Sequence, residues 1–340
     1  MSTIKFVIIG IGNIGKKYVS LVNSFKDAEL LAVVDTDFKK HKSLNNLVPF
    51  FTSVSDFLSA EIPADVICVC TPNGLHPEHT IACLKAGYHV VCEKPIALET
   101  NDVHRMMEAE EKSGKKVFAV MQNRYSPVAI WLKKLMTNQM LGDVLLLQIN
   151  CFWNRNEQYY LDSPWRGTKK LGGGPLYSQF SHFIDLLIWL CGEPQNINAN
   201  LFTLKPKVKT QFNDSGTISF DFAEGGRGTF NFTNAAYQTN LESSLTIIGS
   251  LGNVKVGGQY MEKLDYVNLK KAFEIPVFSQ INQANNYQYY QGSADKHDVF
   301  LSKVIDCIKN NKEPEIGLAD ELNVIHFIEQ ALLSPVSKNY

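Results

Sequence analysis

Three glycines near the start of the chain have the spacing of a nucleotide-binding loop. Gly10, Gly12 and Gly15 in "GIGNIG" follow an apolar run and precede a helical pattern. The first glycine permits a tight turn, the second lets the backbone approach a pyrophosphate, and the third lets helix and strand pack closely. Amides at the start of the helix, at Asn13 and Ile14, would point at the phosphates. The spacing therefore predicts a dinucleotide site.

A carboxylate stands where such sites bind ribose. Asp35 ends the second predicted strand, 20 residues after Gly15, where an acid accepts hydrogen bonds from the adenine ribose. It would also repel the 2′-phosphate of NADP, so NAD is the favoured cofactor. Lys39 and Lys40 lie close in the sequence and keep NADP open as a less favoured alternative.

An apolar helical stretch, "LGGGPLYSQFSHFIDLLIWL" (171–190), carries side chains that could handle a proton. Ser178, His182 and Asp185 are spaced i, i+4 and i+7 and would form one polar stripe on a helix. A buried histidine beside a carboxylate is often a core pair, so His182 is either structural or acts at a reacting hydroxyl. Asp185 either orients the His182 ring or anchors the helix.

The elements that must position these residues alternate in the first part of the chain. Apolar runs rich in Val and Ile predict strands buried on both faces, at 4–10, 29–35, 64–70, 88–94 and 116–122. Helical patterns lie near 14–25, 76–86 and 100–113, the last with Thr100 as N-cap and its end before Gly114. This order predicts an α/β fold with a Rossmann doubly wound parallel sheet.

The pattern changes after residue 122, which predicts two domains, 1–122 and 123–340. A helix is expected near 127–138 and a strand near 143–153, followed by the glycine-led helix and then by alternating strands. In "GTISFDFAEGGRGTFNFTN", Ile218, Phe220 and Phe222 fall on one face, and Thr217, Ser219 and Asp221 on the other. This predicts a large open, mostly antiparallel sheet with a Gly-Gly turn.

The polar face of that sheet is either solvated or docks a second subunit. We expect a homodimer or homotetramer formed through it. The last predicted helices, near 295–311 and 318–333, could pack back on the Rossmann domain.

Composition excludes several classes of protein. The 340 residues carry a net charge of −1 and are 45% hydrophobic, so no basic excess points to nucleic acid. The apolar run at the start is too short for a signal peptide or a membrane span, and we expect a cytoplasmic protein with no membrane partner. Seven cysteines, including Cys68 and Cys70, show no zinc-type pair; buried reduced thiols and no metal are expected.

Several stretches together resemble the Gfo/Idh/MocA family, named for glucose-fructose oxidoreductase and inositol dehydrogenase. They are "GIGNIG", "VVDTD", "TPNGLHPEHTIACLKAGYHVVCEKPIAL", "GGGPLYSQFSHFIDLLIWL" and "GLADELNVIHFIEQALLS". The resemblance covers nearly the whole chain. It implies a Rossmann domain, a C-terminal α/β domain with an open sheet, and redox chemistry on a sugar-like hydroxyl with NAD(P).

The resemblance also implies site residues. Lys94 matches the family's catalytic lysine and His182 its histidine, while Glu93 and Pro95 would shape the turn that aims Lys94. A lysine of pKa about 10.4 becomes a usable base when desolvation and a positive nicotinamide ring lower it. The residues expected to line the cofactor, besides those of the glycine loop, are Thr71, Pro72, Asn73, His76, Glu93 and Lys94.

One position departs from the family's pattern. Many of its dehydrogenases carry an aspartate four residues before the histidine, where this chain has Ser178. A serine can hydrogen-bond but cannot hold the proton as a carboxylate does, which puts an inositol-type triad in doubt.

Arginines and aromatic residues gather in "QNRYSP" (122–127) and "CFWNRNEQYYLDSPWRG" (151–167). Aromatic faces stack on sugar rings or bases, and arginine forks bind carboxylate or phosphate. We expect a hexose-like ring with an anionic group, such as a sugar nucleotide or a uronic acid; alternatively, the aromatics belong to the core or to a subunit interface. The expected substrate-binding residues are Arg124, Tyr125, Trp165, Arg166, Ser178 and Asp185.

The sequence thus predicts an enzyme: an NAD-dependent oxidoreductase acting on a secondary hydroxyl of a sugar, sugar nucleotide or sugar acid. Lys94 would be the acid–base group, with His182 positioning the hydroxyl or relaying the proton. Two alternatives stay open, a non-catalytic cofactor-binding regulator and an NAD-dependent redox glycosidase.

Overall fold

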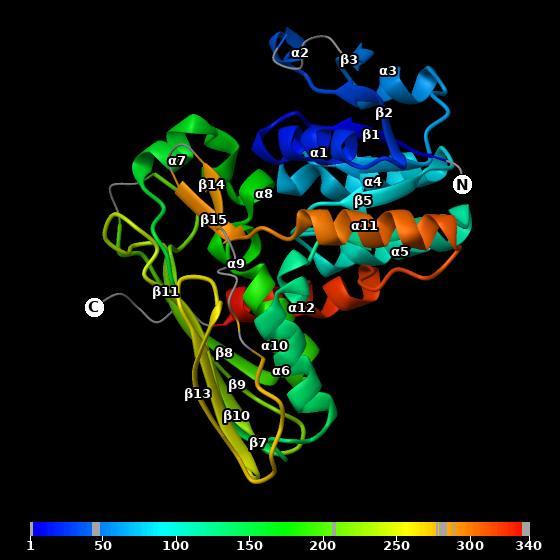
Figure 1. The fold of residues 1–340 in the computed structure, drawn as a ribbon. Helices are drawn as coiled ribbons and strands as arrows, with labels where there is room; N and C mark the ends of the chain where they lie inside the picture. Colours follow the sequence, from blue (N-terminus) through cyan, green and yellow to red (C-terminus); the bar gives the residue numbers. More distant parts are fainter. Residues whose placement is uncertain are drawn as a thin grey trace. The chain divides into compact units, whose positions relative to one another are not determined.

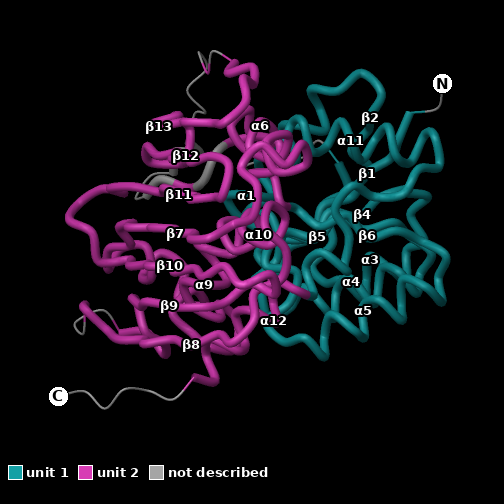
Figure 2. Tube along the Cα trace, turned by 90° about the horizontal axis from the view of Figure 1, so that it is seen from below, with its two compact units in different colours: residues 1–120, 297–322 teal, residues 121–296, 323–340 magenta. Residues whose placement is uncertain are grey.

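The structure, a computed structural model, describes residues 3–42, 48–205, 209–276, 278, 284–287 and 290–334. The chain divides into two compact units (Figure 1, Figure 2). Unit 1 comprises residues 1–120 and 297–322, and unit 2 comprises residues 121–296 and 323–340. Helix α12 (Leu318–Leu333) contributes to both.

A parallel sheet forms the centre of unit 1. Among the described residues its strand order is β3-β2-β1-β4-β5-β6, and every neighbouring pair is parallel. Strands β1, β4, β5 and β6 are buried on both faces, as predicted, whereas β2 exposes Glu29 near its start. Strand β3 is too short to be predicted from its pattern. The strands are β1 (Ile4–Ile9), β2 (Ala28–Val34), β3 (Phe50–Phe51), β4 (Val66–Val69), β5 (His89–Cys92) and β6 (Val117–Ala119).

Helices connect these strands. The predicted helix over 100–113 is confirmed as α5, and Gly114 ends it with a left-handed φ of 63°. The prediction of Thr100 as N-cap is wrong, because Thr100 is already the first helical residue and the extended Glu99 precedes it as the N-cap. The connecting helices are α1 (Asn13–Ser24), α2 (Lys39–Lys42), α3 (Val54–Ser59), η1 (Asn73–Leu75), α4 (His76–Lys85) and α5 (Thr100–Ser113).

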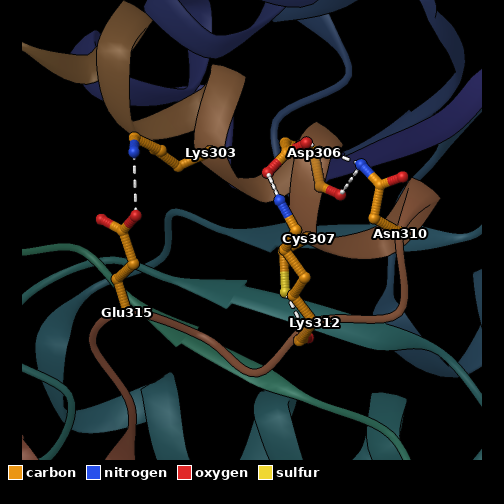
Figure 3. A network of polar contacts seen from close by, with 6 residues as sticks. All are labelled: Lys303, Asp306, Cys307, Asn310, Lys312 and Glu315. Atoms are coloured by element: carbon orange, nitrogen blue, oxygen red, sulfur yellow. Dashed lines mark hydrogen bonds and ion pairs between the residues drawn. The ribbon is translucent and has the colours of Figure 1, made fainter.

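Helix α11 (His297–Lys309) also belongs to unit 1, where it contacts β1. Polar contacts hold the segment that follows it: Lys303 pairs with Glu315 at 2.9 Å (Figure 3). Ile316 O then accepts a hydrogen bond (3.1 Å) from the backbone amide of Ala119, the last residue of the edge strand β6. The C-terminal part of the chain therefore completes the edge of the Rossmann unit.

An open sheet forms the centre of unit 2. Among the described residues its order is β13-β12-β11-β7-β10-β9-β8, with β7 and β10 parallel and every other neighbouring pair antiparallel. The predicted mostly antiparallel sheet is confirmed. The strands are β7 (Val144–Phe152), β8 (Gln195–Phe202), β9 (Ser215–Asp221), β10 (Arg227–Thr233), β11 (Glu242–Gly249), β12 (Gly252–Gly257) and β13 (Lys263–Leu269).

The two faces of this sheet differ as the period-two pattern predicts. Ile218 and Phe220 are buried, whereas Thr217 and Ser219 are exposed. On the buried face, Phe180 packs within 6.5 Å of the Phe230 ring, so the apolar helix stretch covers the sheet.

Short helices and one hairpin complete unit 2. The helices are η2 (Gln122–Tyr125), α6 (Pro127–Thr137), α7 (Glu157–Asp162), η3 (Pro164–Gly167), α8 (Lys169–Gly172), α9 (Pro175–Ser178) and α10 (Ser181–Cys191), and the hairpin pairs β14 (Ala284–Tyr287) with β15 (Tyr290–Ala294). Cys68 and Cys70 of unit 1 are buried free thiols, as predicted. No helix in the described part of the chain has the length and apolar character needed to cross a membrane.

Candidate functional site

The glycine loop between β1 and α1 has the backbone shape that a pyrophosphate requires. Gly10 has a φ of 91°, and a Cβ on it would lie 2.6 Å from Cys70 O. A Cβ on Gly15 would overlap the Gly10 carbonyl oxygen, whereas Gly12 faces open space with nothing within 4 Å. Gly12 is the N-cap of α1 and has no side chain to accept from the first amides of the helix. These residues fit the pyrophosphate of a dinucleotide, and its binding at Gly12 stays a prediction.

Asp35 lies directly after β2 and is buried. Its Oδ2 accepts a hydrogen bond from Ile11 N at 2.7 Å, which ties the carboxylate to the glycine loop. Its Oδ1 accepts from Asp37 N at 2.9 Å, and Lys40 Nζ lies 3.0 and 2.8 Å from the two oxygens.

The loop after β4 is held by a buried histidine. Thr71 and Pro72 lead into η1, which begins at Asn73, and His76 begins α4. The ring nitrogens of His76 lie 2.8 Å from Thr71 O and 2.8 Å from Pro95 O. Burial lowers the pKa of His76, although both carbonyls favour its protonated form. His76 therefore joins the loops after β4 and β5, and its contact with a cofactor stays a prediction.

Lys94 follows β5, at the carboxyl end of the parallel sheet where open α/β folds bind ligands. Its backbone amide donates to Glu93 Oε2 at 3.2 Å, and the Lys94–Pro95 peptide is cis. The buried Glu93 places its Oε1 3.4 Å from His297 Nε2 of α11. Burial opposes the charge of Glu93, but His297 and Lys94 outweigh it and hold the pKa of this acid below its usual value.

His297 lies beside Glu93, the residue before Lys94, and was not predicted from the sequence. Its ring also meets Tyr18 edge-on, with centroids 5.9 Å apart. It lies some 200 residues from Glu93 and outside every motif, so no local signal could have found it.

His182 lies on α10 and is fully buried. Gln122 of η2 places its side-chain nitrogen 3.3 Å from His182 Nε2. As oriented, the amide donates and Nε2 accepts, which requires Nε2 to be without a proton. Gln122 stands in the "QNRYSP" stretch but was not among the expected site residues.

Asp185 pairs with Arg124. Arg124 Nε donates to both carboxylate oxygens, at 3.1 and 2.9 Å, and Nη2 donates to Oδ1 at 2.5 Å. Both side chains are buried. Of the two roles left open for Asp185, these contacts support the anchor, since they tie α10 to η2. They also occupy the Nε edge of Arg124, which was predicted to bind the substrate.

The predicted single helix with a Ser178–His182–Asp185 stripe is wrong at its first member. Ser178 ends α9, and residues Gln179 and Phe180 separate it from α10. Tertiary contacts explain the break: Gln179 Nε2 donates to Tyr159 OH (2.9 Å), and the Phe180 ring packs against the sheet. Ser178 Oγ donates to Gly174 O at 2.7 Å.

One further predicted residue, Arg166, contacts Tyr159. Arg166 of η3 lies over the Tyr159 ring at 4.5 Å and over its neighbour Trp165 at 5.8 Å. Arg155 lies over the same tyrosine at 5.3 Å. Trp165, Arg166 and Tyr125 of η2 are half-buried.

Sequence models and solved structures identify relatives. One model, described as "Oxidoreductase family, NAD-binding Rossmann fold", matches residues 4–121, and another, "GFO/IDH/MocA C-terminal domain", matches residues 130–255. The WlbA dehydrogenase from Chromobacterium violaceum, solved with NADH and UDP-GlcNAcA, is 30% identical, with a TM-score of 0.89 over 100% of this chain and 98% of that chain. The WlbA dehydrogenase from Bordetella pertussis, solved with the same ligands, is 31% identical, with a TM-score of 0.86 over 97% and 96%.

Curated relatives are more distant. D-glucoside 3-dehydrogenase of Escherichia coli is 28% identical over 68% of this chain and 68% of that enzyme. The NADP-linked scyllo-inositol 2-dehydrogenase IolW of Bacillus subtilis is 26% identical over 62% of this chain and 58% of that enzyme. With both family models matched along it, the chain is an oxidoreductase of the Gfo/Idh/MocA family.

Proposed function

We propose that this protein is an NAD-dependent dehydrogenase acting on a secondary hydroxyl of a nucleotide-linked sugar acid. The observation that carries the proposal is the similarity, over nearly the whole chain, to dehydrogenases solved with NADH and UDP-GlcNAcA. The anionic, ring-shaped substrate expected from the arginines and aromatics of 151–167 belongs to the same chemical class.

Lys94 is the proposed acid–base group. Nicotinamide, when bound, accepts or returns the hydride, so the chain must remove or return the hydroxyl proton. The Glu93 contact to the Lys94 amide supports this role because it fixes the backbone from which the side chain extends. His182, held by Gln122, is proposed to position the hydroxyl or relay the proton. Acid–base help of this kind is worth about a hundred- to ten-thousand-fold.

The cofactor is proposed to lie on the glycine loop, with Asp35 at the ribose and Thr71, Pro72, Asn73, His76 and Glu93 around it. For the anionic group of the substrate we assign Arg166 beside Trp165, with Tyr125 as a further contact. Arg166 lies 3.8 Å from the Asp162 carboxylate, which is exposed. The Asp185 carboxylate that occupies the Nε edge of Arg124 is instead fully buried, so Arg124 is the less suited of the two arginines. Ser178 and Asp185 keep structural roles through Gly174 and Arg124.

A matched pair of substrates tests the proposal. Purified protein is incubated with NAD and either UDP-GlcNAcA or UDP-GlcNAc, which lacks the sugar carboxylate but keeps the diphosphate, and nicotinamide absorbance is followed. We expect turnover of the sugar acid and at least about tenfold less with UDP-GlcNAc, because charge-assisted hydrogen bonds to the carboxylate exceed neutral ones in strength. Turnover of neutral inositols or aldoses without turnover of the acid would refute the substrate class.

We also propose that the open face of the unit 2 sheet pairs with a second copy, giving a cytoplasmic homodimer or homotetramer. Leu146, Ile248 and Tyr266 are 46%, 38% and 53% exposed on strands of this sheet, and Leu146 is the direct cross-strand partner of Ile248. Light scattering after size-exclusion chromatography tests this proposal, and a monomeric wild-type protein contradicts it. Leu146→Glu should lower the mass to that of a monomer.

A further inference from the structure

The carboxylate of Asp35 is already fully engaged. Oδ2 accepts from Ile11 N at 2.7 Å and from Lys40 Nζ at 2.8 Å, and Oδ1 accepts from Asp37 N at 2.9 Å and from the same Nζ at 3.0 Å. A carboxylate offers about four acceptor sites. Two hydroxyls of a ribose can therefore bind Asp35 only where a present donor withdraws.

Lys40 is the donor that can withdraw. Ile11 N and Asp37 N belong to backbone next to β1 and β2, so their positions are fixed by the fold. The Lys40 side chain is 34% exposed, against 7% for Asp35, and reaches the acid on a flexible four-carbon stem. The Lys40 ammonium thus occupies the acceptor sites that a ribose diol needs.

The structure gives Lys39 and His41, the residues on either side of Lys40, other contacts. The Lys39 amide donates to Asp37 Oδ1 at 3.0 Å, while His41 Nε2 lies 2.9 Å from Val48 O. The His41 ring also stacks near Phe50, with centroids 5.0 Å apart. Lys40 is therefore the basic side chain of α2 for which the structure gives a contact with Asp35.

We propose that Lys40 is a removable counter-ion of Asp35 and that it thereby allows both NAD and NADP to bind. With NAD, the ammonium leaves the carboxylate and the ribose hydroxyls replace it. With NADP, the same ammonium offsets the charge of Asp35 and pairs with the 2′-phosphate. This inference rests on the dinucleotide site of the proposed function.

The proposal predicts opposite effects of one substitution on the two cofactors. Lys40→Ala removes a competitor for the acceptor sites of Asp35, so NAD should bind about two- to fivefold more tightly, as a partly exposed ion pair allows. It also removes the charge that pairs with the 2′-phosphate, so NADP should bind about tenfold or more weakly. A change that merely damaged the loop would weaken both.

The test is direct titration of the full chain with NAD and with NADP, by calorimetry, in the absence of substrate. Lys39→Ala is the matched control and should leave the ratio of the two dissociation constants within about twofold, and Lys40→Arg should restore NADP binding at least partly. Equal weakening of both cofactors by Lys40→Ala, or no change, would overturn the proposal. So would a wild-type protein that binds NAD but no NADP.

Substrate plays no part in this titration, so its failure is distinguishable from failure of the proposed reaction. A protein that binds both cofactors with the predicted shifts but turns over no sugar nucleotide supports the role of Lys40 and refutes the substrate class. A protein that binds neither cofactor overturns the dinucleotide site, and this inference with it.

Discussion

Each unit contains a cluster of polar residues. The two clusters differ in whether the polar side chains mainly contact backbone atoms or other side chains. The loop cluster of unit 1 consists of His76, Glu93, Lys94 and His297. Apart from the Glu93–His297 pair, its contacts run from side chain to backbone: His76 contacts two backbone carbonyl oxygens and Glu93 accepts from the Lys94 amide. These side chains fix the path of the backbone at the ends of β4 and β5.

The helix cluster of unit 2 consists of Gln122, Arg124, His182 and Asp185. Its contacts run from side chain to side chain: Gln122 to His182 at 3.3 Å, and Arg124 to Asp185 at 2.5 Å. Here the backbone is already helical. The polar side chains instead fix the His182 ring and attach α10 to η2.

The difference indicates what substitutions will do in each place. In the loop cluster, a substitution that spares the backbone contacts should spare cofactor binding, whatever it does to turnover. In the helix cluster, removal of one partner takes a polar contact from a side chain that stays buried, so the main loss should be stability.

The largest expected effect comes from Lys94→Ala. Lys94 enters the loop cluster through its backbone amide, so truncating the side chain leaves the hydrogen bond to Glu93 in place. We expect turnover to fall by about a thousand- to ten-thousand-fold, in the range of lost acid–base catalysis, with NAD affinity nearly unchanged. Nicotinamide absorbance and calorimetry measure the two quantities. Lys85→Ala, at the exposed end of α4, is the control, and an active Lys94→Ala enzyme would show that the acid–base group lies elsewhere.

The helix cluster should respond in stability. Asp185→Ala leaves the Arg124 guanidinium buried without this partner, and we expect unit 2 to lose about 3–5 kcal/mol of free energy of unfolding. Urea unfolding followed by tryptophan fluorescence measures the loss. The double variant Arg124→Met, Asp185→Leu should recover most of it, because apolar side chains of similar volume need no counter-charge. If the double variant is as unstable as Asp185→Ala, the charge is not the cause.

The pH dependence of stability tests a histidine of unit 1 outside the loop cluster. His89 in unit 1 accepts from the Lys116 backbone amide at 3.0 Å, and burial, followed by the charges of Lys115 and Lys116, lowers the pKa of His89 to about 4. The unfolded chain binds this proton near pH 6.5. Stability from His89 is therefore fully present above about pH 6.5 and lost as the pH falls toward 4.

For this half-buried ring we expect a loss of about 1–2 kcal/mol after allowance for solvent screening. His89→Asn keeps an acceptor for the Lys116 amide but does not titrate, so its melting temperature should fall less between pH 7 and pH 5. His104→Asn, on an exposed position of α5, should follow the wild type. Parallel curves for all three proteins would mean that His89 does not contribute.

The two clusters also differ in how far they could be predicted. The positions of Gly10, Gly12 and Gly15 follow from local backbone requirements, and the β1 and β2 strands from runs of Val and Ile. The loop residues after β4 and β5 lie at strand ends, which the alternating pattern already locates. The strands and loops of unit 1 can therefore be predicted from short stretches of sequence. His297 is the exception, because a helix distant in sequence brings it to Glu93.

The helix cluster depends on contacts that spacing does not encode. Arg124 and Asp185 are 61 residues apart, and their pairing follows from how η2 packs on α10. The break at Gln179 arises because its amide contacts Tyr159 and Asn234, at 2.9 and 3.0 Å. Helical periodicity alone continues the helix through such a residue, since it contains no information about distant partners.

The smallest expected effect concerns Ser178, the last residue of α9. Because Ser178 Oγ donates to Gly174 O at 2.7 Å, Ser178→Ala should cost about 0.5–1.5 kcal/mol of stability, the usual contribution of one hydrogen bond. Turnover per folded molecule should stay within about twofold, since the Ser178 hydroxyl already donates its proton to Gly174 O. Urea unfolding and steady-state kinetics measure both. A tenfold loss of turnover at unchanged stability would instead place Ser178 at the reacting hydroxyl, and the helix cluster would then include a residue from α9.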